Sequence, residues 1–225
     1  MKKLLAAIIA AALLLSGCSL SSRPAVSAPP AETPSPSPTP IVTPTPAPEP
    51  SDDELVLVRD YIPGIFIDLK YATTDNFTGQ VIYDSDEAYL RYGTVKKLLA
   101  AQNELSGRGL SLKIWDAYRP VSAQFKLWEI CPNPVYVSDP NNGYSKHSRA
   151  NTVDITLVTS TGESIPMPSG FDDFTSLADR DYSDVSDEAA ENARLLENVM
   201  VENGFVPYSG EWWHYSDSVA YDVYG

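Results

Sequence analysis

The chain has 225 residues, of which 43% are hydrophobic, so it is long and apolar enough to bury the core of one globular domain. Its formal net charge of -14 at pH 7 disfavours polyanionic partners, because like charges repel. Nucleic acid is therefore excluded as an expected partner.

The first segment of the chain has the pattern of a secretory signal. Lys2 and Lys3 precede an apolar run over 4–15 that is too short to span a membrane. The run ends in the residues LSGC at 15–18, which resemble a bacterial lipobox, and an ordinary secretory signal with a chance cysteine is the alternative. We expect residues 1–17 to be a removed lipoprotein signal peptide and Cys18 to be lipidated. The expected location is the bacterial cell envelope, outside the cytoplasm and anchored to a membrane.

The next segment is rich in proline, serine and threonine and has almost nothing from which to build a core. This composition is typical of an extended spacer with polyproline II character. We expect residues 18–50 to form the lipidated cysteine and this linker, and residues 51–225 to form one folded domain.

Five stretches of the domain have the composition of β-strands, with β-branched and aromatic residues in abundance. In one of them Val153, Ile155 and Leu157 alternate with Asp154 and Thr156, which predicts a strand with one packed face. The predicted strands cover residues 65–69, 110–115, 153–157, 205–206 and 212–215.

Helices are predicted where apolar residues recur every three or four positions. Helices and strands mix without a regular βαβ order, so we expect an α+β domain with a small mixed, largely antiparallel sheet and helices packed on it. The predicted helices are 95–105, ended by Gly107 and Gly109; a segment after Pro120 with Val121, Phe125 and Trp128 on one face; and 187–204, capped by Ser186 and ended by Gly204.

The chain has two histidines, and each stands close in sequence to a carboxylate. Asp154 follows His147 and lies between two apolar residues, where a carboxylate needs a partner or a metal. His214 lies three residues after Glu211, in the segment EWWHY. His147, Asp154 and His214 together would suit catalytic zinc, which takes three protein ligands. Packed or surface histidines, and an aromatic core strand with an exposed glutamate, are the alternatives.

Two further residues would complete a hydrolytic site. Zinc lowers the pKa of its water, and Glu211 is placed in sequence to take the proton as that water attacks a carbonyl. Arg119 follows a predicted strand and is fixed before Pro120, so it is the candidate for stabilising the oxyanion that results.

The second cysteine of the chain, Cys131, lies in WEICPNP. A packed, inert thiol is the favoured interpretation, because no histidine, aspartate or lysine is adjacent. A nucleophile with a partner distant in sequence is the alternative.

The motifs together resemble a known family, the zinc D-Ala-D-Ala peptidases. The residues that carry the resemblance are Ser145-x-His147-(six)-Asp154 and Glu211-Trp212-Trp213-His214. The sequence is most similar to D-Ala-D-Ala dipeptidases of the VanX type, with agreement extending through residues 68–73, 75–79, 115–120 and 204–205. The resemblance implies the metal-site fold that this family shares with lysostaphin-type enzymes and the hedgehog signalling domain.

The resemblance implies a role for each matching residue. One Zn²⁺ ion would be held by His147, Asp154 and His214, Glu211 would be the catalytic base, and Arg119 would stabilise the transition-state oxygen.

Substrate contacts are also implied. Ser145 would contact the substrate, and Tyr71 lies in a segment that the family places at the substrate pocket. The segment GFDDF at 170–174 matches the family segment whose aspartate receives the free ammonium of the dipeptide; Asp172 fits best, although Asp173 competes for the role.

Two positions depart from the family pattern. Ala150 replaces a usual glycine and Thr152 a usual alanine, both between metal ligands, which puts the substrate preference in question. We expect a zinc dipeptidase acting on a small D-amino-acid dipeptide or a peptidoglycan-derived peptide. The alternatives are a D,D-carboxypeptidase that trims peptidoglycan stems, a zinc-holding binding module without turnover, and an L,L-dipeptidase.

Overall fold

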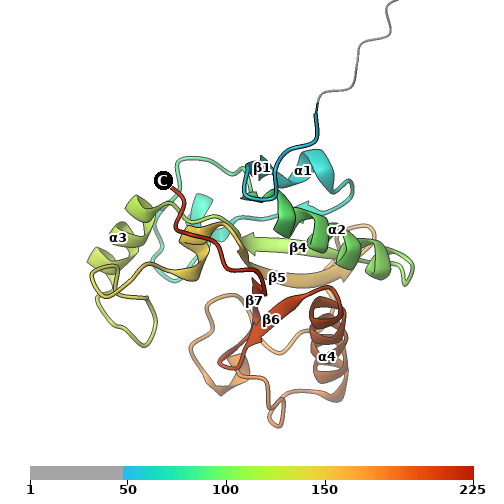
Figure 1. Cartoon of the computed structure of the whole chain (residues 1–225). Coiled ribbons are helices and arrows are strands. Elements are labelled where there is room, and N and C mark those ends of the chain that lie inside the picture. Colours follow the sequence, from blue (N-terminus) through green and yellow to red (C-terminus); the bar gives the residue numbers. More distant parts are fainter. Residues whose placement is uncertain (1–47) are drawn as a thin grey trace, which may run out of the picture. The chain divides into compact units, whose positions relative to one another are not determined.

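The computed structural model describes residues 48–225 (Figure 1). The predicted signal peptide, Cys18 and nearly all of the predicted spacer lie outside the described residues. A five-stranded sheet with the order β2-β4-β5-β7-β6 organises the domain. Its strands are β2 (Phe66–Ile67), β4 (Leu110–Asp116), β5 (Thr152–Thr159), β6 (Phe205–Tyr208) and β7 (Glu211–Asp217).

The pairing of these strands confirms the expected α+β class with a largely antiparallel sheet. Strands β4, β5, β7 and β6 pair antiparallel, and only β2 runs parallel to its neighbour β4. The predicted strand at 65–69 is too long, because only Phe66 and Ile67 pair with β4; a 3-10 helix, η1 (Lys70–Ala72), follows.

Strand β5 lies at the centre of the sheet, and both of its faces are buried. The prediction of one packed face is wrong here, since Asp154 and Thr156 are buried as well as the apolar residues that alternate with them. A central strand covered on both sides must give every polar side chain a partner. For Asp154, that partner defines the candidate site described below.

Two long helices confirm the predicted periodicity and its end signals. Helix α2 (Tyr92–Ser106) ends at Gly107, and Gly109 takes a left-handed φ of 73° in the turn into β4. Helix α4 (Asp187–Glu202) begins after Ser186, whose hydroxyl accepts a hydrogen bond from the amide of Ala189. Gly204, with φ 87°, turns the chain from α4 into β6.

Helix α3 (Val121–Ile130) is present, but it buries a different face from the predicted one. Phe125 is 42% exposed, whereas Ala123, Gln124 and Leu127 are buried. The buried polar residue explains the difference, because Gln124 donates to the carbonyl oxygen of Ser138 and accepts a hydrogen bond from the candidate site. The spacing of apolar residues cannot predict which face of a helix is buried when a polar side chain on that face is buried by its hydrogen bonds.

The sequence patterns did not predict a small second sheet. Strand β1 (Leu55–Leu57) pairs antiparallel with β3 (Tyr89–Arg91), and the short helix α1 (Val58–Tyr61) follows β1. The two remaining 3-10 helices are η2 (Lys146–Arg149) and η3 (Ser176–Ala178).

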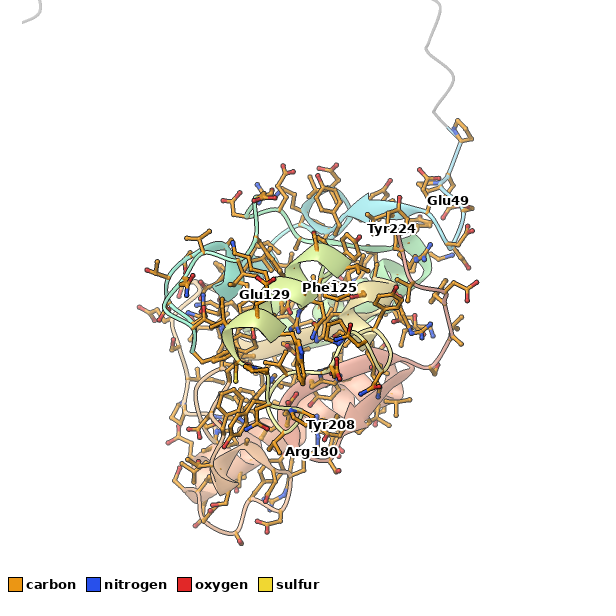
Figure 2. All side chains as sticks on the ribbon, turned by 90° about the vertical axis from the view of Figure 1, so that its left-hand side faces the viewer. Glu49, Phe125, Glu129, Arg180, Tyr208 and Tyr224 are labelled. Carbon is orange, nitrogen blue, oxygen red and sulfur yellow. The ribbon has the colours of Figure 1, made fainter. Side chains whose placement is uncertain are left out.

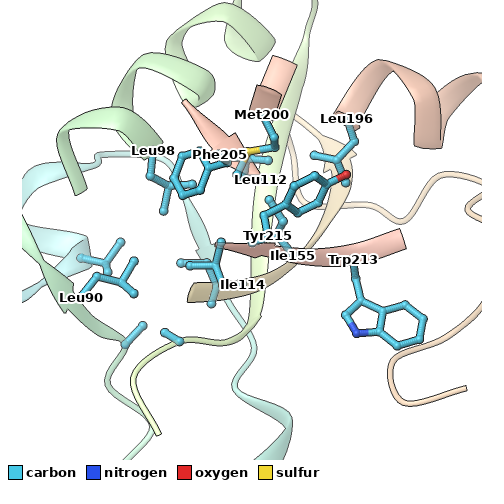
Figure 3. Packing of buried hydrophobic residues seen from close by; sticks show 14 of the residues in the cluster. Leu90, Leu98, Leu112, Ile114, Ile155, Leu196, Met200, Phe205, Trp213 and Tyr215 are labelled. Atoms are coloured by element: carbon cyan, nitrogen blue, oxygen red, sulfur yellow. The ribbon is translucent and has the colours of Figure 1, made fainter. Parts of the chain in front are cut away.

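One apolar core joins the central sheet to α2 and α4 (Figure 3). Within it, Leu112, Ile155 and Tyr215 of the sheet pack in the same cluster as Leu98 of α2 and Leu196 of α4. Trp212 and Trp213 are also fully buried, so the aromatic segment around His214 fixes the position of that histidine. Within residues 48–225, no helix is long and apolar enough to cross a membrane.

Candidate active site

The sheet register brings the three predicted metal ligands together. Asp154 of β5 is the direct partner of His214 on β7, so their side chains leave adjacent strands side by side. His147 comes from η2, which precedes β5 and packs against it. One donor atom from each of the three residues lies within 4.8 Å of the others, and all three residues are buried.

Asp154 stands between the two imidazoles. Its Oδ1 lies 2.9 Å from Nδ1 of His214, and its Oδ2 lies 3.3 Å from Nε2 of His147. Burial raises the pKa of Asp154, but the two histidines lower it more, and the net value is well below its usual range. The group is therefore a carboxylate at neutral pH and provides the negative charge of the site.

The hydrogen bonds of His147 show which of its ring nitrogens is available to bind a metal ion. Its Nδ1 lies 2.9 Å from the carbonyl oxygen of Ala117, which can only accept, so Nδ1 carries a hydrogen. In the neutral ring Nε2 then has a lone pair, which faces a carboxylate oxygen of Asp154. Two acceptors at this distance need a cation or a proton between them, and a carbonyl acceptor behind a ligating histidine is the usual support in metal sites. His147, Asp154 and His214 are therefore suited to bind a divalent metal ion.

The turn that holds His147 depends on its neighbours. The hydroxyl of Ser145 accepts a hydrogen bond from the amide of His147 at the start of η2. Ala150 ends the turn with a left-handed φ of 58°, a conformation that costs a non-glycine residue about 1–2 kcal/mol. This strain gives a physical reason for the glycine that the resembled family has at this position.

Glu211 lies beside the candidate metal ligands and is not one of the three clustered donors. Its Oε2 is 3.5 Å from Nδ1 of His214. Burial, and next the nearby charges of Asp154 and Asp172, raise the pKa of Glu211 to about 8, while His147 opposes the shift. A carboxyl group with a raised pKa suits proton transfer near neutral pH.

Arg119 is fixed by three of its own hydrogen bonds. Its Nε and one terminal nitrogen donate to the same oxygen of Asp116, at 3.1 and 2.6 Å, and its other terminal nitrogen donates to Gln124 at 2.9 Å. A guanidinium has five N–H groups, so two remain for a substrate or a developing oxyanion. Its carbon also lies 5.0 Å from the centre of the Tyr71 ring.

Tyr71 and Asp172 meet although they are far apart in sequence. The hydroxyl of Tyr71 donates to Oδ2 of Asp172 at 2.7 Å, and Asp172 has a left-handed φ of 52°. Burial raises the pKa of Asp172 to about 7, against the effect of the Tyr71 hydrogen bond. Asp173 instead accepts hydrogen bonds from Thr175, so the structure brings Asp172 and not Asp173 to the tyrosine.

Most of the chain matches a known protein family. A family model described as D-ala-D-ala dipeptidase, in the peptidase M15 family, matches residues 51–222. The chain belongs to this peptidase family. It is therefore a metallopeptidase, and the cluster of His147, Asp154 and His214 is its candidate metal site.

Several proteins similar to this peptidase are named D-alanyl-D-alanine dipeptidases. The D-alanyl-D-alanine dipeptidase of Escherichia coli (strain K12) is 39% identical over 162 residues, which is 72% of this chain and 83% of that protein. The D-alanyl-D-alanine dipeptidase of Enterococcus faecium is 35% identical over 68% of this chain and 86% of its own length. That of Enterococcus faecalis (strain ATCC 700802 / V583) is 34% identical over 73% of this chain and 91% of its own length.

The sequence patterns missed Asp116, which links the candidate metal site of the peptidase to Arg119. Asp116 is fully buried, and its carboxylate accepts hydrogen bonds from Tyr83, from the amide of Ala117 and from Arg119. One of its oxygens lies 3.6 Å from Nδ1 of His147. A signal was present, since an aspartate three residues before a candidate arginine is the spacing of a local ion pair.

Arg180 was also missed, and it holds β7 of the peptidase from outside. It donates to the carbonyl oxygens of His214 and Tyr208, pairs with Glu197 and lies over the ring of Tyr215. Figure 2 shows Arg180 beside Tyr208, on the face that also carries Phe125 and Glu129. No local pattern marks this arginine, because all of its partners lie in other segments.

A cavity of about 260 Å³ opens beside Glu211 and His214. Ser145 also lines this cavity, so the structure places the predicted substrate contact next to the predicted base and one predicted metal ligand, although its role stays a prediction. Cys131 is a free thiol, partly buried against the core, and does not line this cavity. The remaining lining residues are Pro134, Val135, Tyr136, Ser138, Lys146 and Tyr208.

Proposed function

We propose that this peptidase is a zinc-dependent dipeptidase that hydrolyses D-Ala-D-Ala outside the cytoplasmic membrane. The observation that carries the proposal is the buried cluster of His147, Asp154 and His214 with Glu211 within 3.5 Å of a ligand. The choice of D-Ala-D-Ala as the substrate is supported by the names of the similar proteins, which are D-alanyl-D-alanine dipeptidases. The choice of zinc is supported by the candidate ligands, which are two imidazoles and one carboxylate.

Each residue has a distinct task in the proposed reaction. Zinc held by His147, Asp154 and His214 would supply Lewis acidity toward the scissile carbonyl and would acidify the attacking water. Glu211 takes the proton of that water and gives it to the leaving amine. The two free N–H groups of Arg119 stabilise the negative charge that develops on the carbonyl oxygen.

Asp172 accounts for the preference for a free dipeptide. A partly buried carboxylate next to the site is stabilised by a positive partner, and the ammonium group of an unblocked dipeptide supplies one. Tyr71 orients the carboxylate through its hydroxyl. An N-acylated peptide has no charge to offer at this point, so it leaves Asp172 desolvated and unpaired.

The proposed activity is tested by comparing D-Ala-D-Ala, its N-acetyl derivative and L-Ala-L-Ala as substrates of the purified peptidase. We expect kcat/KM for the free D,D-dipeptide to exceed the other two by about a hundredfold or more. Preference for the acetylated substrate would favour a D,D-carboxypeptidase, and preference for the L,L-peptide an ordinary dipeptidase. A metal-loaded protein that hydrolyses none of them would favour a binding module.

The role of Asp172 predicts a pH dependence. Below its pKa of about 7 the carboxyl group is neutral and cannot pair with an ammonium, so the affinity that it contributes is lost as the pH falls. We expect Asp172→Asn to lower kcat/KM for D-Ala-D-Ala by about 10- to 100-fold at pH 8. The ratio of wild-type to variant kcat/KM should then decrease toward 1 as the pH is lowered through 7.

The matched control for this prediction is Asp173→Asn. It removes the same charge from the neighbouring residue, whose contacts are with Thr175. Asparagine at position 172 can still accept the hydrogen bond from Tyr71, so the fold of the segment is kept. An effect of Asp173→Asn equal to that of Asp172→Asn, or a ratio that does not change with pH, would contradict the assignment.

The proposed location rests on the residues before the described part of the chain, with LSGC at 15–18 as its support. A lipid-modified Cys18 would anchor the peptidase, and the segment rich in proline would hold it away from the membrane. We expect the full chain, expressed in bacteria, to fractionate with membranes and partition into detergent, and Cys18→Ser to abolish both. A soluble wild-type chain in the cytoplasmic fraction would refute this location.

A further inference from the structure

The cavity beside Glu211 and His214 is lined by a positively charged residue, Lys146, that has no role in the proposed reaction. Of the described residues that line this cavity, Lys146 is the one lysine, and none is an arginine. Its side chain is exposed, whereas its neighbours in the chain, Ser145 and His147, are buried. A cation is therefore present on the wall of a pocket whose other charged side chain is the proposed catalytic base.

The backbone of Lys146 is fixed while its ammonium group is available. Hydrogen bonds on both sides hold the turn: the amide of His147 donates to Ser145, and the amide of Arg119 donates to the carbonyl oxygen of His147. Within residues 48–225 the ammonium of Lys146 pairs with no carboxylate. Its aromatic neighbour is Tyr208, whose ring centre lies 6.0 Å from Nζ.

Two series of contacts lead from the metal centre to opposite charges. In the first series, the rings of His214 and Tyr208 are 5.8 Å apart, and Lys146 lies next to the ring of Tyr208. In the second series, Asp116 contacts both His147 and Arg119, and Arg119 lies over Tyr71, which is hydrogen-bonded to Asp172. Contacts between neighbouring side chains thus connect the candidate metal site both to a cation, Lys146, and to an anion, Asp172.

We propose that Lys146 binds the terminal carboxylate of the dipeptide. This inference rests on the proposed function, in which Asp172 receives the ammonium at the other end of the same substrate. A free dipeptide is a zwitterion whose two charges flank one peptide bond. Lys146 lines the cavity beside Glu211 and His214, and Asp172 is connected to the candidate metal site through Tyr71 and Arg119. Together the two residues select for length, since a longer peptide cannot place both of its terminal charges against them.

The inference is tested with a pair of substrates that differ only in the charge of the carboxyl end. D-Ala-D-Ala and D-Ala-D-alaninamide are compared on the wild type, on Lys146→Gln and on Lys146→Arg. We expect Lys146→Gln to raise KM for D-Ala-D-Ala about tenfold, with kcat changed by less than about threefold, because a charge-assisted contact to the substrate is lost. For the amide, wild type and Lys146→Gln should have the same KM, and Lys146→Arg should restore most of the affinity for D-Ala-D-Ala.

Lys126→Gln is the matched control for the loss of one positive charge. Lys126 donates to the carbonyl oxygen of Val81, and it does not line the cavity, so its replacement should leave both substrates unaffected. An equal loss on both substrates after Lys146→Gln would show a structural effect and overturn the inference, as would an unchanged KM for D-Ala-D-Ala. If the wild type hydrolyses neither substrate, the proposed function itself fails, and the inference fails with it.

Discussion

Replacing Glu211 by glutamine is expected to lower kcat for D-Ala-D-Ala about a thousandfold, the scale of a lost general base. Glutamine keeps the size and the hydrogen-bonding oxygen of the side chain but cannot take a proton. Because Glu211 is not among the three clustered donors, the variant should bind as much metal as the wild type. Steady-state kinetics and elemental analysis of the same protein sample measure both quantities.

Glu129→Gln serves as the control for this replacement, since Glu129 is an exposed residue of α3 and its substitution should not change kcat. A Glu211→Gln variant that keeps more than about a tenth of the activity would show that another group moves the proton. A variant that loses its metal would show instead that Glu211 is a ligand, and the distribution of roles in the site would have to be revised.

Replacing Asp154 by asparagine is expected to have a second large effect, on metal binding. Its carboxylate contacts both histidines and supplies the negative charge among the three donors. If three ligands and a water share roughly 10–16 kcal/mol of zinc binding energy equally, losing one weakens binding by about 100- to 1000-fold. A competition titration with a chelator measures this change, and activity at limiting zinc should fall with it.

A large excess of zinc gives the internal control for Asp154→Asn. If the fold is intact, excess zinc should restore part of the activity, and thermal unfolding should remain cooperative. Metal affinity equal to that of the wild type would contradict the assignment of Asp154 as a ligand. Loss of cooperative unfolding would call for the same titration on His147→Gln, which changes a ligand outside the central strand.

Local patterns in the sequence were enough to predict most of the central sheet and the histidine-bearing segments. The alternation around Asp154 and the aromatic residues around His214 each identify a strand, and the structure pairs these two residues directly. Both strands can be predicted because the pattern that identifies each of them lies in its own neighbouring residues. The caps of α4 were predictable for the same reason, since Ser186 acts on an amide three residues away.

Contacts between distant segments could not be predicted in this way. Tyr71 and Asp172 are 101 residues apart, and nothing near either one indicates the other. The buried face of α3 includes Gln124, which donates to the carbonyl oxygen of Ser138 in the loop beyond the helix, so the apolar spacing was misleading. For Asp116 only the pairing with Arg119, three residues away, had a local signal, whereas its hydrogen bond from Tyr83 joins two segments that meet only in the folded chain.

The proposed metal centre holds one catalytic zinc ion on His147, Asp154 and His214. Its most direct test is elemental analysis of the purified peptidase combined with X-ray absorption spectroscopy at the zinc edge. The expected result is one zinc per chain, coordinated by two imidazole nitrogens and at least one carboxylate oxygen. A chain that hydrolyses D-Ala-D-Ala without stoichiometric metal, or zinc whose coordination lacks imidazole, would contradict it.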